Sequence, residues 1–245
     1  MGAVDGPHPE DGEAPARAIH QSAYRIGRTT ITNRVFSKFV SVTGYQTLAE
    51  QHGGSHVFQG QLSDPEQHPL IATIAPWWRW VTGASWRKPD GRHDAQDNLP
   101  VVHVSLADAL AFCDWSGTRL PTEAEWEQAA GSQKGITPHI WQGEFPNDPL
   151  VPPGPRPAND AIANEFGVIH ACGNVWEWTA DRFTKLHSPR PDFNPKGPLN
   201  GQQFVVKGGS FLCSPSYCAR YRPSSRRAES PDATTSHLGF RVATT

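Results

Sequence analysis

The sequence lacks several features that would place a protein in a common class. Its 245 residues contain 22 Lys and Arg against 24 Asp and Glu, so it lacks the basic excess of a nucleic-acid-binding protein. No apolar run approaches the roughly 18 residues that span a bilayer. The polar, proline-rich N-terminus lacks the apolar centre of a signal peptide. We therefore expect no nucleic-acid partner, no membrane association and a cytoplasmic location.

The motifs of several large enzyme classes are also missing. There is no GxxxxGK[ST] phosphate-binding loop and no GxGxxG that opens a helix, which disfavours a nucleotide-dependent enzyme. There is no GxSxG turn of a serine hydrolase and no HExxH zinc motif. The 11 histidines are scattered, and none forms a Cys-His zinc pattern. The chemistry must therefore come from other side chains.

Glycine, proline and tryptophan are abundant instead. The chain has 22 Gly, 23 Pro and 9 Trp beside a single Met. Many Gly and Pro residues produce many turns, and large aromatic rings are needed to hold those turns in place. We expect one compact domain over residues 1–245 with little regular secondary structure. Residues 1–25 are predicted to form an irregular arm, of which residues 1–10 could lack order.

Three segments predict helices. The first lies between Thr32, a plausible N-cap, and Gly44, and its apolar residues recur at i, i+3 and i+4. The other two begin at capping boxes, Ser105 with Asp108 and Thr122 with Glu125. Valines in 101–104 predict a short strand, the run FVVK at 204–207 a buried strand that enters a glycine turn, and GFRVATT a final strand.

The four cysteines are Cys113, Cys172, Cys213 and Cys218, and in a chain without an export signal we expect them to be reduced. Cys213 and Cys218 are separated by four residues, a spacing that is wrong for CxxC motifs. Pro215 lies between them and favours a turn, in which the two thiols could converge. They are then a redox pair or a two-thiolate site for Cu(I), or else two buried, inert cysteines.

Two further groups deserve a chemical interpretation. Glu177 lies between two tryptophans in GNVWEW, residues 173–178, and is either a ligand of a hard cation or a hydrogen-bonded carboxylate in a packed aromatic turn. His52 and His56 have the spacing of metal ligands only on a helix, which Gly53 and Gly54 disfavour. We interpret the two histidines as a solvated loop pair.

Several motifs occur in an order that resembles the formylglycine-generating enzymes, also called sulfatase-modifying factors. They are DGEAPAR, TNRVFSKFVSVTGY, PVVHVSLADALAFCDWSGTRLPTEAEWE, WQGEFP, GNVWEWTADRF, VKGGSFLCSPSYCARYR and PDATTSHLGFRV. RLPTEAEWE and GNVWEW mark the wider superfamily. The GGSFLC and YCARYR segments are more specific, because their cysteine pair distinguishes active enzymes of this family from inactive relatives.

The resemblance implies a single α+β domain, distantly similar to C-type lectins and poor in regular structure. It implies an enzyme that uses copper and dioxygen to oxidise a cysteine in a CxPxR motif of a sulfatase, in unfolded or extended form, to Cα-formylglycine. By the same resemblance, Cys213 and Cys218 are the Cu(I) ligands, and Ser210, Trp176 and Tyr217 line the oxygen and substrate site. We expect a monomer.

Calcium sites are a further feature that the resemblance implies, and here they look eroded. His139 and His170 stand where Asn is common in the family. The carbonyls of Gly173 and Val175 and the side chain of Glu177 remain as tentative calcium ligands.

Two alternatives to this function stay open. The chain could be a copper-dependent oxidase of another thiol substrate, or a non-catalytic, lectin-like binding module. The presence of both Cys213 and Cys218 argues against the second of these.

Overall fold

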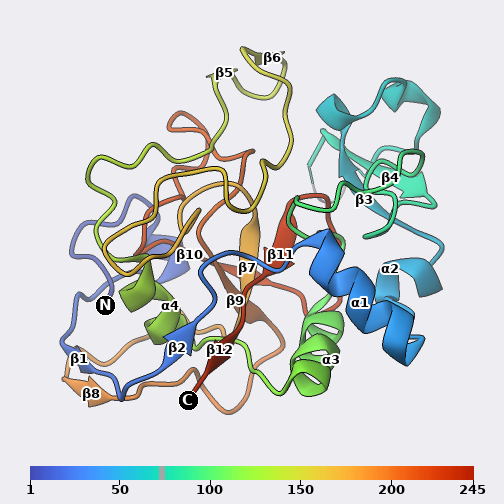
Figure 1. The fold of residues 1–245 in the computed structure, drawn as a ribbon. Coiled ribbons are helices and arrows are strands. Elements are labelled where there is room, and N and C mark those ends of the chain that lie inside the picture. Colours follow the sequence, from blue (N-terminus) through green and yellow to red (C-terminus); the bar gives the residue numbers. More distant parts are fainter. Residues whose placement is uncertain (72–74) are drawn as a thin grey trace.

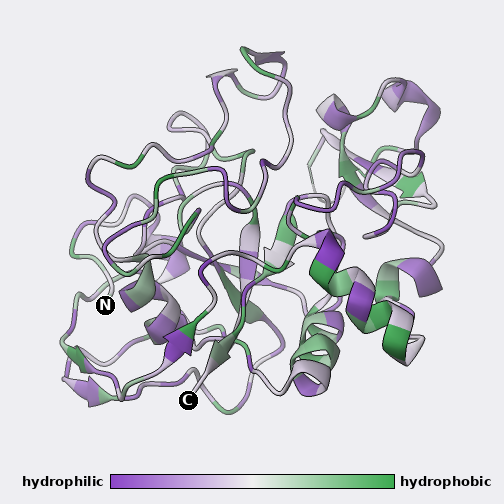
Figure 2. Cartoon of the chain, in the orientation of Figure 1, coloured by the Kyte–Doolittle hydropathy of each residue, from purple (hydrophilic) through white to green (hydrophobic). Residues whose placement is uncertain are grey.

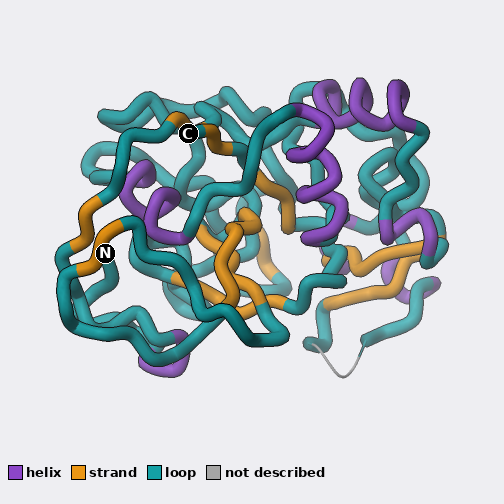
Figure 3. The backbone as a smooth tube through the Cα atoms, turned by 90° about the horizontal axis from the view of Figure 1, so that it is seen from below, coloured by secondary structure: helices purple, strands orange, loops and turns teal. Residues whose placement is uncertain are grey.

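The computed structural model describes residues 1–71 and 75–245. Within them, short helices and strands are joined by long loops, which make up most of the tube in Figure 3. The α-helices are α1 (Asn33–Thr43), α2 (Leu48–Gln51), α3 (Leu106–Ser116) and α4 (Glu123–Ala130). The 3₁₀-helices are η1 (Pro9–Asp11), η2 (Gln59–Gln61) and η3 (Pro65–Gln67). No helix of these described residues is long and apolar enough to cross a membrane.

Four strands form the central sheet, in the order β10 (Arg226–Glu229), β9 (Phe204–Lys207), β7 (Trp176–Arg182) and β11 (Leu238–Phe240). β7 is antiparallel to β9 and parallel to β11 (Figure 1). The other strands pair in twos: β1 (Ile19–His20) with β8 (Asp192–Phe193), β2 (Arg25–Ile26) with β12 (Ala243–Thr244), β3 (Gly54–Phe58) with β4 (Trp78–Thr82), and β5 (Gly143–Glu144) with β6 (Asp148–Pro149).

Helices α1 and α3 pack beside this sheet and bury one apolar face each. Hydrophobic and hydrophilic residues alternate around α1 in Figure 2, as the period of an amphipathic helix requires. Phe36 and Phe39 of α1 contact Phe112 of α3, with ring centroids 5.9 and 5.6 Å apart. Phe112 in turn packs against Phe240 of β11, 5.4 Å away. This aromatic cluster joins the two helices to the sheet and forms the largest part of the core.

The three predicted helices are confirmed, together with the ends that were predicted for them. Ser105 and Thr122 cap α3 and α4 through complete capping boxes, and Gly44 ends α1 in the left-handed region at φ 68°. The run at 204–207 is the strand β9, as predicted. In GFRVATT, the regular structure is divided between the end of β11 and β12.

Two predictions about local structure are wrong. Residues 101–104 form no strand, because their backbone bonds go to loops: Val101 N–H donates to Ile31 and His103 N–H to Thr235, and His103 has φ 60°. His56 is not in a solvated loop, since it lies in β3, opposite Trp80 of β4.

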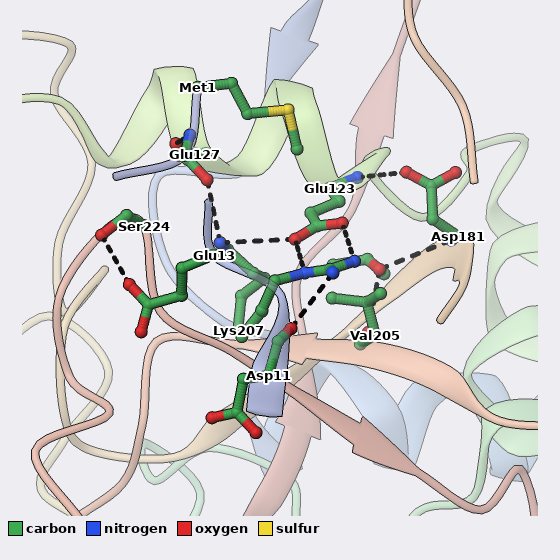
Figure 4. Close-up of polar contacts among 12 residues, drawn as sticks. Met1, Asp11, Glu13, Glu123, Glu127, Asp181, Val205, Lys207 and Ser224 are labelled. Carbon is green, nitrogen blue, oxygen red and sulfur yellow. Dashed lines mark hydrogen bonds and ion pairs between the residues drawn. The ribbon is translucent and has the colours of Figure 1, made fainter. Parts of the chain in front are cut away.

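A buried ion network ties the N-terminal arm to the sheet (Figure 4). Lys207 of β9 is fully buried, and its ammonium lies 3.0 Å from Glu127 and 3.6 Å from Glu123, both of α4. Arg226 of β10 donates to Glu123 at 2.6 and 2.8 Å and to the carbonyl of Asp11 in η1 at 3.2 Å. Because buried charges must be paired, this network fixes residues from four separate segments.

A second buried ion pair lies at the junction of β7 and β11. Glu177 and Arg241 are both fully buried, and the guanidinium donates from Nε and Nη2 to the two carboxylate oxygens at 2.5 and 2.6 Å. The indole N–H of Trp126 donates to the same carboxylate at 2.7 Å. The remaining guanidinium hydrogens reach the carbonyls of Gly27 and Ile169 at 3.0 and 3.1 Å.

We predict that Glu177→Gln destabilises the fold by about 3–5 kcal/mol, because it leaves the Arg241 charge buried without a partner. Asp97→Asn is the matched control, since the Asp97–Arg34 pair is exposed and should change stability by less than about 1 kcal/mol. Urea unfolding of both variants measures the difference. Equal, small losses would show that the Glu177–Arg241 pair is not a major source of stability.

Candidate active site

The site begins where β9 ends at a glycine turn. Gly208 and Gly209 have φ 91° and 72°, in the left-handed region that favours glycine. A Cβ on Gly209 would lie 2.7 Å from the carbonyl oxygen of Arg220 and 3.1 Å from Sγ of Cys213. A side chain there would therefore push apart the two ends of the loop that carries the cysteines.

The loop over 210–219 folds back on itself, as Pro215 predicts. Cys213 N–H donates to the carbonyl of Ser210 at 2.9 Å, and Cys218 N–H donates to the carbonyl of Ser214 at 3.0 Å. These two turns face Cys213 and Cys218 toward each other, and a hydrogen bond joins their side chains. All four cysteines are free thiols, so the pair is reduced in this structure.

The two thiols of the pair differ in acidity. Burial raises the pKa of Cys213 well above its usual value, and the hydrogen bond with Cys218 raises it further. The same hydrogen bond, received from Cys213, lowers the pKa of Cys218, and backbone hydrogen bonds at Arg220 and Ser214 add to this effect. Cys218 is thus the more acidic thiol of the pair. A thiolate, and not a thiol, is the form that acts as nucleophile or metal ligand.

The pair opens on a pocket of about 350 Å³. Five of its lining residues are the sequence-predicted Ser210, Cys213, Cys218, Trp176 and Tyr217. One wall is aromatic: the ring of Tyr217 stacks on Phe145 with centroids 4.4 Å apart and meets Trp77 edge-on at 5.2 Å. Trp78 and His237 extend the wall, with centroids 4.8 Å apart. Since half of Tyr217 is exposed, this wall is reachable from outside.

Charged residues also lie at and beside the pocket, and the sequence reasoning missed them. Asp11 lines the pocket and pairs with Arg220 at 2.5 Å, while Glu13 pairs with Arg222 at 2.6 Å. His8 contacts the carbonyl of Cys218 through Nε2. The N-terminal arm, with Met1 N bonded to the carbonyl of Arg17 at 3.0 Å, therefore lies across the cysteine loop. The motif DGEAPAR was the available signal, but its partners are more than 200 residues away.

The remaining cysteines lie away from the pocket. Burial raises the pKa of Cys113 to about 11 and that of Cys172 to about 12. Cys113 is buried in α3 as predicted, in contact with the aromatic cluster. Both are neutral thiols at physiological pH.

Comparison with known proteins agrees with this arrangement. The domain family described as "Sulfatase-modifying factor enzyme 1-like domain" matches residues 1–245. The formylglycine-generating enzyme of Mus musculus is 43% identical over 99% of this chain and 72% of its own length. That of Thermomonospora curvata is 42% identical over 96% of this chain and 86% of its own. The chain belongs to the formylglycine-generating enzyme family.

The fold of the family is shared with more distant proteins. The structure of PvdO from Pseudomonas aeruginosa superimposes with a TM-score of 0.68 at 18% identity, over 99% of this chain and 88% of that one. At this identity the likeness concerns the fold alone. It confirms the α+β class with little regular structure that the sequence implied.

Calcium does not fit at Glu177 in this member of the formylglycine-generating enzyme family. Both carboxylate oxygens already accept hydrogen bonds from Arg241 and Trp126, and the Arg241 charge balances that of Glu177. Ca²⁺ takes six to eight oxygen ligands, and the other residues predicted for it are the backbone carbonyls of Gly173 and Val175. The structure therefore agrees with the interpretation of Glu177 as a hydrogen-bonded carboxylate in a packed turn, and not as a calcium ligand.

We predict that, in chelator-treated protein, iodoacetamide alkylates Cys218 faster than Cys113 or Cys172. The fast alkylation of Cys218 should persist at pH values at which an ordinary thiol no longer reacts. The reason is that Cys218 has a lowered pKa and stays a thiolate until the pH falls below that pKa. In Cys213→Ala the hydrogen bond is lost, so the pKa rises and the rate at pH 7 should fall severalfold. Mass spectrometry of the labelled peptides measures this, and an unchanged pH profile in Cys213→Ala would contradict it.

Proposed function

We propose that this chain oxidises a cysteine in a CxPxR segment of a sulfatase to Cα-formylglycine, with copper as cofactor and dioxygen as oxidant. The observation that carries the proposal is the hydrogen-bonded pair of Cys213 and Cys218 at the base of an open aromatic pocket. Family membership supports the same chemistry.

The pair fits a soft, monovalent ion. Two sulfur atoms face each other, one is already predisposed to be a thiolate, and soft sulfur ligands select Cu(I). Cys213 and Cys218 would hold the ion, and the second thiol would lose its proton on binding, as metal ligation requires. When bound, Cu(I) supplies one-electron redox chemistry toward dioxygen and an attachment point for the substrate thiolate.

The net reaction needs a reductant besides dioxygen. The substrate CH₂–SH becomes CHO, so a C–S bond and a C–H bond break, a C=O bond forms, and the sulfur leaves as H₂S. This oxidation supplies two electrons, whereas O₂ accepts four on reduction to water. Two molecules of an external thiol supply the other two electrons and become a disulfide, and one H₂O is released net.

Protein residues position the substrate and shield the reacting sulfur. The rings of Tyr217, Phe145 and Trp77 offer an apolar surface to the proline of the CxPxR segment. Trp176 is buried beside the thiols and limits the access of water. The carbonyl of Ser210 accepts a hydrogen bond from the Cys213 amide at 2.9 Å, and its hydroxyl accepts one from the Leu212 amide at 3.2 Å. These two bonds hold the shape of the loop.

We predict that Cys213→Ser and Cys218→Ser each abolish turnover, whereas Cys113→Ala and Cys172→Ala retain it, because only the first two lie in the pocket. Cys113→Ala should cost stability of about 1 kcal/mol. The assay is a CxPxR peptide incubated in air with copper and a thiol reductant, and mass spectrometry detects the exchange of sulfur for oxygen.

The outcomes of this assay separate the competing functions. Full activity in Cys218→Ser would overturn the assignment of the pair. Copper binding by the wild-type protein without conversion of any CxPxR peptide would favour another thiol substrate. Neither copper binding nor conversion would favour a binding module.

We also predict that Tyr217→Ala lowers kcat/KM for the peptide roughly 2- to 10-fold, mainly through KM, because it removes one exposed ring of the aromatic wall. Copper binding should not change, since the ring is not a ligand. Phe193→Ala is the matched control, an exposed aromatic residue in β8. An equal effect of both variants would exclude a role of the wall in substrate binding.

A further inference from the structure

We propose that Arg227 binds a carboxylate of the substrate polypeptide, so that the pocket prefers a CxPxR segment with Asp or Glu within it or directly beside it. This inference rests on the proposed function, since the carboxylate belongs to the same substrate. It assigns Arg227 a role in the choice of substrate and no part in the oxidation.

The register of the central sheet directs Arg227 toward the thiol pocket. Arg227 of β10 lies opposite Val206 of β9, which in turn lies opposite Trp178 of β7. Successive side chains of a strand point to opposite faces of a sheet. Arg226 turns toward α4, where it pairs with an acidic residue. Arg227 therefore turns to the other face, and there it lines the pocket of the thiol pair.

The guanidinium of Arg227 is accessible at the edge of the sheet. β10 is an edge strand of the four-stranded sheet, and 42% of the Arg227 side chain is exposed. A half-buried arginine packs its aliphatic stem and keeps its charged head in contact with water. The head presents N–H donors in a planar fork that matches the two oxygens of a carboxylate. Arg227 can therefore donate two parallel hydrogen bonds to an acidic side chain of a bound peptide.

The partner of Arg227 within the protein holds it loosely. Oε2 of Glu229, two residues further along β10, lies 3.4 Å from Nη2 of Arg227. The other arginine of the pocket, Arg220, is held more closely, since it lies 2.5 Å from Asp11 and 3.1 Å from Glu10. A long and partly exposed ion pair contributes little to stability, because water competes for both charges. A substrate carboxylate can therefore replace Glu229 without a large loss of stability.

The other residues of the pocket leave the charge of Arg227 in place. Apart from the thiol pair, the charged residues of the described chain that line this pocket are Asp11, Arg220 and Arg227. Asp11 and Arg220 neutralise each other. Burial lowers the pKa of His237, another lining residue, well below its usual value, so this imidazole is neutral. Arg227 is thus the loosely paired cation that an approaching acidic side chain meets.

The charge of Arg227 also limits how the substrate segment lies in the pocket. Two positive charges in contact repel each other, so the arginine of the CxPxR motif must point away from Arg227. A Lys or Arg elsewhere in the segment is disfavoured at Arg227 for the same reason. The pocket therefore selects both for an acidic residue and against a basic one at the position that faces Arg227.

The test compares CxPxR peptides that differ at one position. Glu, Gln or Lys is placed in turn at the two variable positions of the motif and at the residues that flank it. With the wild-type protein, kcat/KM at one or two neighbouring positions should be roughly 3- to 10-fold higher for Glu than for Lys, with Gln between them. In about 0.5 M NaCl this ratio should fall toward 1, because salt screens partly exposed charges.

Variants of Arg227 show whether its charge causes the preference. Arg227→Gln should bring the ratio of Glu to Lys peptides to about 1, and Arg227→Glu should reverse it. Arg34→Gln is the matched control, because Arg34 is an exposed arginine of α1 that does not line the pocket, and it should keep the wild-type ratio. A preference for Glu that remains in Arg227→Gln would overturn the proposal. An equal loss of turnover with all peptides would also overturn it, and would indicate that the guanidinium acts on the thiol pair instead.

A binding measurement separates this proposal from the proposed reaction. Fluorescence polarisation of labelled peptides, with Ser in place of the motif's cysteine, measures their Kd for the full chain without turnover. The Glu peptide should bind more tightly than the Lys peptide to the wild-type protein and to Arg34→Gln, but not to Arg227→Gln. If this preference is present and no CxPxR peptide is converted, the proposed reaction is wrong and the carboxylate site stands. Binding that does not depend on the peptide's charge, or no binding of any peptide, overturns the carboxylate site whether or not peptides are converted.

Discussion

The buried ion pair of Glu177 and Arg241 is the constraint on which the rest of the structure depends. It joins the first part of β7 to the residue that follows β11, and the guanidinium also binds carbonyls at Gly27 and Ile169. A fully buried charge is tolerated only with all its hydrogen bonds made, so the pair fixes four segments at once. Trp176, the neighbour of Glu177, is thereby placed in the wall of the pocket.

A chain so poor in regular structure needs such polar anchors. Its loops form few of the regular backbone hydrogen bonds that join strands in a sheet. Side chains must therefore satisfy buried polar groups. Lys207, Arg226 and the arm residues Asp11 and Glu13 do this on one side of the sheet. The same contacts bring the N-terminal arm over the cysteine loop, so the anchoring of the fold and the shape of the pocket have a common origin.

The thiol pair shows how the fold changes the acidity of a cysteine. Burial alone makes Cys113 and Cys172 weaker acids than free cysteine. At Cys218 a hydrogen bond from the second thiol outweighs the same burial. This difference in pKa depends on a turn of a few residues. Gly208 and Gly209 allow the turn because both have positive φ and because Gly209 lies too close to the backbone of Arg220 for a side chain.

The sequence by itself determined the three longer helices and the strand at 204–207, and through the family resemblance it indicated Cys213 and Cys218 as the candidate pair. Capping boxes at Ser105 and Thr122 act within four residues, so the starts of these two helices could be predicted. Pro215 between two cysteines indicated a turn. The strand predicted over 101–104 was wrong, because valines favour strands only where a partner ladder exists, and here the neighbours are loops. Only the tertiary structure decided what the two thiols face, namely the arm residue Asp11 and the wall of Trp77 and Phe145. It also decided which residue pairs with Glu177. Those contacts join residues 64 to 209 positions apart, and no local pattern of side chains encodes which distant segments will meet.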